Sequence, residues 1–206
     1  MNNIHWEFAR RFGSQWVKVK FFKERPDLTK GKRMKRVRFC EAVKKAIVQP
    51  ILLDRESITC EGAQYAFGWK GNAKKEFLNK CQIKNKNQMI ILKSMFFKTP
   101  RFKNFYEYIG LNVEGEPDLI ISFMLPKQVM DLIKIYNAYQ GNSVDVSLCS
   151  MMSICGGIAV RTLLEGKICF SFGCDESRQF ARLGNDRVAV GVPKRLFNIF
   201  ADEILV

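Results

Sequence analysis

Hydrophobic positions recur along the chain with the periods of strands and helices in turn. Over residues 16–22, Val17, Val19 and Phe21 alternate with lysines, and this period of two predicts a half-buried strand. Residues 119–125 form an uninterrupted apolar run of strand length. Other short apolar runs predict further strands at residues 51–53, 89–92, 144–148, 167–172 and 188–190.

Helical spacing fills the segments between these runs. Pro126 suits the first position of a helix, and Gly141 ends the same segment. Residues 98–118 contain two prolines and two glycines and are expected to be irregular. The alternation of strands and helices predicts an α/β (α+β) fold, a mixed sheet with helices packed on it. The predicted helices are residues 3–12, 39–48, 60–67, 73–80, 126–140, 151–160, 174–183 and 193–205.

The length of 206 residues suits one domain, and we expect a single domain over residues 1–206. Among the seven cysteines, Cys40 and Cys60 have 19 residues between them, and Cys155 and Cys174 have 18. Each pair spans the length of a helix plus a strand. The spacing indicates either two diverged halves or chance, since seven cysteines form many pairs. Diverged halves in a pseudo-two-fold arrangement would bring equivalent cysteines together at the centre.

Charge is distributed unevenly along the chain. Residues 1–103 hold 25 Lys and Arg against 8 Asp and Glu, a net charge of +17, whereas residues 104–206 hold 9 against 12, a net charge of −3. The basic N-terminal half predicts attraction to nucleic acid or to an acidic protein. The alternative is a solvated loop, because no nucleic-acid-binding motif accompanies the charge. The candidate anion-binding residues are Lys32, Arg33, Lys35, Arg36, Arg38 and Arg178.

The compartment follows from what the sequence lacks. No run of about 18 apolar residues predicts a membrane span, and the first ten residues lack the apolar segment of a secretory signal. We therefore expect a cytoplasmic protein without a membrane partner, in which the cysteines stay reduced. Reduced cysteines are buried packing groups, metal ligands or redox nucleophiles. His5 is the sole histidine, so histidine-based catalysis away from that end is not expected.

An ordered set of short segments resembles one family. They include Arg-Phe-Cys-Glu-Ala-Val around Cys40 and Gly-Cys-Asp-Glu-Ser-Arg around Cys174. Together they resemble the domain-of-unknown-function 169 family, an uncharacterised archaeal cysteine-rich group, from about residue 16 to residue 204. The segments are residues 38–43, 58–63, 67–68, 125–130, 154–155, 172–178 and 191–193.

The resemblance directs attention to four cysteines, Cys40, Cys60, Cys155 and Cys174. Four thiolates can complete a zinc site or hold an iron–sulfur cluster. Against this hypothesis, the chain has no CxxC motif, and free cysteine often only packs in a core. We expect a protein that binds a metal or an iron–sulfur cluster, with a redox or cofactor-handling role. Two alternatives stay open: a basic module for nucleic acid or an acidic partner, and a metal-free protein that binds a small molecule.

Overall fold

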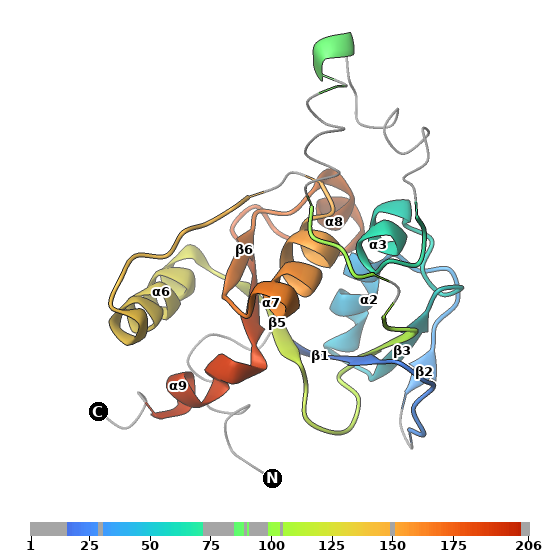
Figure 1. Ribbon diagram of the computed structural model, residues 1–206, viewed down its shortest axis with the longest axis horizontal. Helices are drawn as coiled ribbons and strands as arrows, with labels where there is room; N and C mark the ends of the chain where they lie inside the picture. The colour runs from blue at the N-terminus through green and yellow to red at the C-terminus, as the bar shows by residue number, and fades with distance from the viewer. Residues whose placement is uncertain are drawn as a thin grey trace.

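The computed structural model describes residues 16–28, 31–71, 85–88, 90, 99–103, 105–148 and 151–202 (Figure 1). The helices predicted at residues 3–12 and 73–80 lie outside these ranges, as do Cys81 and Cys149. Residue 90 is helical, so the strand predicted at residues 89–92 is not formed at the one position of it that is described.

Seven strands in the described ranges form one mixed sheet with the order β2-β3-β4-β1-β5-β7-β6. The central strands β1 and β5 pair antiparallel, and the pairing of β2 with β3 is parallel. The strands are β1 (Trp16–Phe22), β2 (Lys32–Arg33), β3 (Ile51–Asp54), β4 (Tyr108–Leu111), β5 (Leu119–Met124), β6 (Cys169–Ser171) and β7 (Val188–Pro193).

Apart from β2, which lies beyond β3 and has no counterpart, the sheet has the same strand order on both sides of its central pair. Outward from β1 come β4 and β3, and outward from β5 come β7 and β6, all paired antiparallel. In each triplet the first strand in the chain is central, the third is next and the second is outermost. The two halves of the sheet are thus related by a pseudo-two-fold axis that passes between β1 and β5.

Helices cover both faces of the sheet, as Figure 1 shows. The larger core lies between one face and α2, α3 and the segment η1. The smaller core lies on the other face, beneath α6 and α9. The helical segments are α2 (Phe39–Ala46), α3 (Glu61–Ala66), α6 (Pro126–Gln140), the π-helical η1 (Ser153–Val160), α7 (Arg161–Glu165), α8 (Asp175–Phe180), η2 (Lys194–Leu196) and α9 (Phe197–Asp202).

Local sequence explains the best-defined elements. In α2 the buried residues Phe39, Ala42, Val43 and Ala46 follow helical spacing and form one apolar face. In β1 every second residue is buried. Helix α6 ends at Gly141, which adopts the left-handed conformation that glycine accepts at lowest cost. None of the helices in the described ranges is long and apolar enough to span a membrane.

The predicted mixed sheet with packed helices is confirmed, but two further segments were predicted wrongly. Residues 98–118 are not wholly irregular, because β4 forms there between β3 and β1. Gly110 interrupts the apolar pattern of β4. Glycine is needed at this position because a Cβ there would lie 2.4 Å from Val113 Cγ2. Residues 144–148 form no strand, and all but the first are exposed and pair with no neighbour in the sheet.

Candidate thiol site

Four helical segments on the larger-core face have a cysteine at or close to their first residue. Cys40 is the second residue of α2, Cys60 directly precedes α3, Cys155 is the third residue of η1, and Cys174 directly precedes α8. Helix α2 packs against α8, and η1 packs against both α3 and α2. All five cysteines in the described ranges, these four and Cys169, are free thiols. We refer to Cys40, Cys60, Cys155 and Cys174 as the thiol cluster.

Glu176 in the first turn of α8 contacts two thiols from the first half of the chain. Its carboxylate Oε2 accepts a hydrogen bond from Cys60 Sγ at 3.4 Å. The same oxygen forms an ion pair with Arg38 Nη1 at 2.5 Å. Cys40 Sγ lies 4.0 Å from the main-chain oxygen of Glu176, a long hydrogen bond. The Arg38 guanidinium also lies 4.2 Å from the ring centroid of Phe180. Cys40 and Cys60 therefore lie against the helical turn that follows Cys174.

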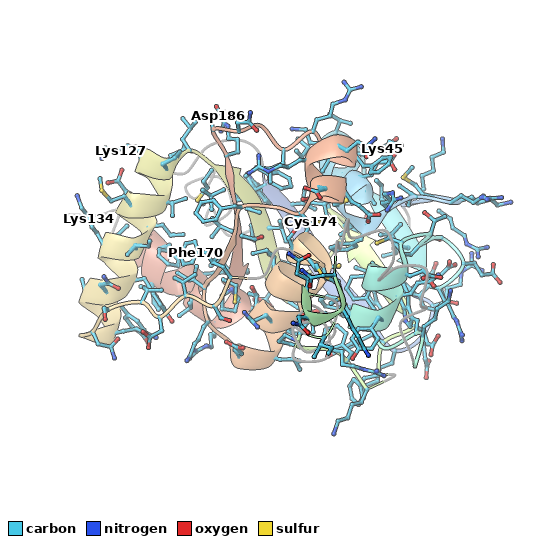
Figure 2. All side chains as sticks on the ribbon, turned by 90° about the horizontal axis from the view of Figure 1, so that it is seen from above. Lys45, Lys127, Lys134, Phe170, Cys174 and Asp186 are labelled. Carbon is cyan, nitrogen blue, oxygen red and sulfur yellow. The ribbon has the colours of Figure 1, made fainter. Side chains whose placement is uncertain are left out.

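Two buried serines tie the start of η1 to the start of α8. The backbone N–H of Cys174 donates to both Ser153 Oγ and Ser177 Oγ, each at 2.8 Å. Ser177 Oγ donates in turn to the Cys174 carbonyl, and the two hydroxyl oxygens are 3.3 Å apart. Because Ser153 lies two residues before Cys155, these bonds fix the positions of Cys155 and Cys174 relative to each other. Figure 2 shows Cys174 near the middle of the molecule, among the helices.

The thiols of the cluster influence one another electrostatically. Burial, followed by the charges of Cys174 and Cys60, raises the pKa of Cys40 to about 12. Burial and the carboxylate of Glu176 raise the pKa of Cys60 to about 11. The pKa of the buried Cys155 thiol is raised well above its ordinary value by burial and then by Cys60, Cys174 and Cys40. At neutral pH the Cys40, Cys60 and Cys155 thiols are therefore protonated in the metal-free protein.

The raised thiol pKa values favour metal binding over a role as a redox nucleophile. A redox nucleophile needs a lowered thiol pKa, whereas the pKa values of Cys40, Cys60 and Cys155 are raised. A soft cation removes thiol protons on binding and replaces the repulsion between thiolates with attraction to the metal. Within the described ranges, however, no three His, Cys, Asp or Glu side chains converge closely enough to hold one metal ion. The geometry thus provides four thiols in one place without a preformed site for a single tetrahedral ion.

The six predicted anion-binding residues do not form one site. Arg38 joins the thiol cluster, while Arg33 pairs with Asp54 at 2.7 Å and with Glu56 at 2.8 Å. Arg178 donates to the carbonyl of Phe172 at 2.5 Å and so braces the turn before Cys174. The three remaining residues, Lys32, Lys35 and Arg36, are exposed.

Sequence reasoning missed Glu176 and the two serines. Glu176 stands next to Asp175 in the sequence, and adjacent carboxylates diverge on a helix, so the pair itself indicates no site. The available signal was its position two residues after Cys174, on the same helical turn. Ser177 stands three residues after Cys174, at the capping position of α8, which also could have been read from the sequence.

The fold and the cluster define a mixed α/β protein in which two similar half-sheets bring four thiols together beneath one layer of helices. The chain matches the DUF169 family, described as uncharacterised ArCR, over residues 11–202 and therefore belongs to it. No curated protein and no solved structure matches the chain.

Proposed function

We propose that this protein binds a soft-metal group through the thiolates of Cys40, Cys60, Cys155 and Cys174. The observation that carries the proposal is the convergence of these four cysteines, from segments far apart in the chain, at the starts of four packed helical segments. Zinc and iron–sulfur clusters are the groups that thiolate sets of this size hold.

The surroundings of the cluster support a metal role over simple packing. Cys60 donates to a carboxylate that also holds Arg38, a polar arrangement that an inert packing cysteine does not require. Cys155 is buried, whereas Cys40, Cys60 and Cys174 are only half-buried, so the cluster is not wholly sealed from solvent. Partial access suits a redox or cofactor-handling role, in a reducing compartment such as the cytoplasm, where free thiols persist.

The test is anaerobic purification of the full chain, followed by metal analysis and a visible absorption spectrum. The proposal expects bound metal, with sulfur-to-iron charge-transfer absorption where the metal is iron, and a Cys40→Ser/Cys174→Ser variant should bind less metal than the parent chain. Cys169→Ala is the matched control, because Cys169 is a buried free thiol on β6 outside the cluster. A folded chain that takes up neither zinc nor iron with sulfide would overturn the proposal, as would equal metal loss in the control.

A second candidate function is favoured by one separate observation. Lys32, Lys35 and Arg36 are exposed within a chain half of net charge +17. These cations are available to the phosphates of a nucleic acid or to an acidic protein. Such binding could accompany metal binding, since these side chains are not part of the thiol cluster.

A further inference from the structure

The pseudo-two-fold relation of the sheet extends to the elements that carry the thiols. In the first half α2 lies between β1 and β3 in the chain, and α3 lies between β3 and β4. In the second half η1 lies between β5 and β6, and α8 lies between β6 and β7. Under this relation α2 corresponds to η1 and α3 to α8. Cys40 therefore corresponds to Cys155, and Cys60 corresponds to Cys174.

Side-chain hydrogen bonds repeat in the same way. Gln64 stands four residues after Cys60, and its Nε2 donates to the carbonyl oxygen of Ile58, two residues before that cysteine, at 2.6 Å. Arg178 stands four residues after Cys174, and its Nη2 donates to the carbonyl oxygen of Phe172, two residues before that cysteine, at 2.5 Å. The turn before each cysteine is thus braced by the same contact made with a different residue type. This repetition supports the origin of the two halves as diverged copies of one unit.

Packing between the halves pairs each cysteine with a non-equivalent cysteine of the other half. Helix α2 packs on α8, and the corresponding contact is that of η1 on α3. The first contact places Cys40 against the turn of Cys174, where Cys40 Sγ lies 4.0 Å from the Glu176 main-chain oxygen. The second contact joins the helical segments at whose starts Cys60 and Cys155 stand.

We infer that the bound group is a two-metal centre in which one metal is held by Cys40 and Cys174 and the other by Cys60 and Cys155. Each metal then takes one thiolate from each half of the chain, and the pseudo-two-fold axis exchanges the two ends. This inference rests on the proposed function and specifies its ligand class: two soft metal ions bridged by inorganic sulfide, as in a cluster of two irons and two sulfides. Because no three such side chains converge on one point within the described ranges, the inference assigns only two protein thiolates to each metal.

The first test is the stoichiometry of the full chain after anaerobic reconstitution with ferrous iron and sulfide. We expect about two irons and about two sulfides per chain, the content of a two-iron cluster with four cysteine ligands. Four irons and four sulfides per chain, or one iron without sulfide, would overturn the two-metal centre while leaving the proposed function standing. A chain that takes up no metal at all would overturn the proposed function itself.

The second test separates the two pairs by cadmium titration, followed by the ultraviolet absorption of the thiolate–cadmium bond. A Cys40→Ser/Cys174→Ser variant loses both ligands of one metal, so it should keep about half of the cadmium bound by the parent chain. A Cys40→Ser/Cys155→Ser variant loses one ligand from each metal and should bind neither ion tightly. Equal retention by the two double variants, with Cys169→Ala at the parent value and all chains folded by circular dichroism, would overturn the pairing.

Discussion

Burial and neighbouring charges raise the pKa values of thiols in the cluster. Burial raises the pKa of Cys40 to about 12 and that of Cys60 to about 11, against about 8.5 for an unperturbed thiol. Glu176 contributes to both shifts, because its carboxylate lies 3.4 Å from Cys60 Sγ and its charge also acts on Cys40. The cluster therefore holds protons in the metal-free protein that it must release when a soft metal binds.

These raised pKa values predict the pH dependence of stability in the metal-free chain. As pH rises above about 8.5, the unfolded chain loses its thiol protons first, so the folded state becomes relatively less stable. The thiol contribution is fully present below about pH 8.5 and is lost as pH rises towards 11 and 12. Thermal unfolding followed by circular dichroism should show this decline, and Cys60→Ser should flatten it. An identical decline in parent and variant would contradict the account.

The Arg38–Glu176 ion pair predicts the effect of one further substitution. Glu176→Gln leaves the Arg38 guanidinium without its carboxylate, and we expect the free energy of unfolding to fall by about 1 kcal/mol. Glu116→Gln is the control, because Glu116 pairs with Lys194 at 2.7 Å with both side chains largely exposed, and should cost less than about 0.5 kcal/mol. Urea unfolding measures both values. Equal losses would mean that the Arg38–Glu176 pair behaves as an ordinary surface pair.

At the scale of elements, sequence periodicity predicted best those helices and strands whose burial pattern is set by their own residues. The alternation in β1, the apolar face of α2, and the Pro126 and Gly141 boundaries of α6 were all read correctly. Strand β4 was missed because its pairing depends on β3 and β1, and Gly110 conceals its pattern. Residues 144–148 alternate like a strand but pair with no strand in the described ranges, which only the tertiary structure reveals.

The contact between η1 and the sheet gives a prediction at this scale. A Cβ at Gly191 in β7 would lie 2.2 Å from Thr162 Oγ1 and 2.8 Å from Ile158 Cγ2. Gly191→Ala should therefore push the η1–α7 segment off β7 and lower stability by about 1–3 kcal/mol. Gly71→Ala is the matched control, because among the described residues, its chain neighbours aside, no atom lies within 4 Å of a Cβ there. Chemical unfolding of both variants tests the close approach, and an unchanged free energy of unfolding in Gly191→Ala would contradict it.

Across the whole molecule, charge is distributed unevenly along the chain although the strand order repeats on the two sides of the sheet. Residues 1–103 carry a net charge of +17 and residues 104–206 a net charge of −3. The four cysteines could be selected from the sequence, but their pairing could not, because it depends on packing between helices that are far apart in the chain. The spacing of Cys40 to Cys60 and of Cys155 to Cys174 left two interpretations open, related halves or chance. The mirrored strand order accords with related halves.

The charge asymmetry predicts salt-sensitive binding to single-stranded nucleic acid. Affinity measured by fluorescence anisotropy should fall steeply between about 50 and 200 mM salt, because counterions are released on binding. Lys32→Gln/Lys35→Gln should weaken binding more than Lys127→Gln/Lys134→Gln, which removes equal charge from α6, where both lysines project outward (Figure 2). No binding at low salt, or equal weakening in both variants, would reject this second function.

The central claim is that the four clustered thiols bind a soft-metal group. X-ray absorption at the metal edge of the loaded full chain tests it most directly, because it counts the sulfur atoms bound to each metal. The account predicts a shell of sulfur atoms at about 2.3 Å, as is typical of metal–thiolate bonds. Cys169→Ala should preserve this shell, and Cys40→Ser/Cys174→Ser should diminish it. A shell of oxygen and nitrogen alone around the metal of the loaded parent chain would contradict the claim.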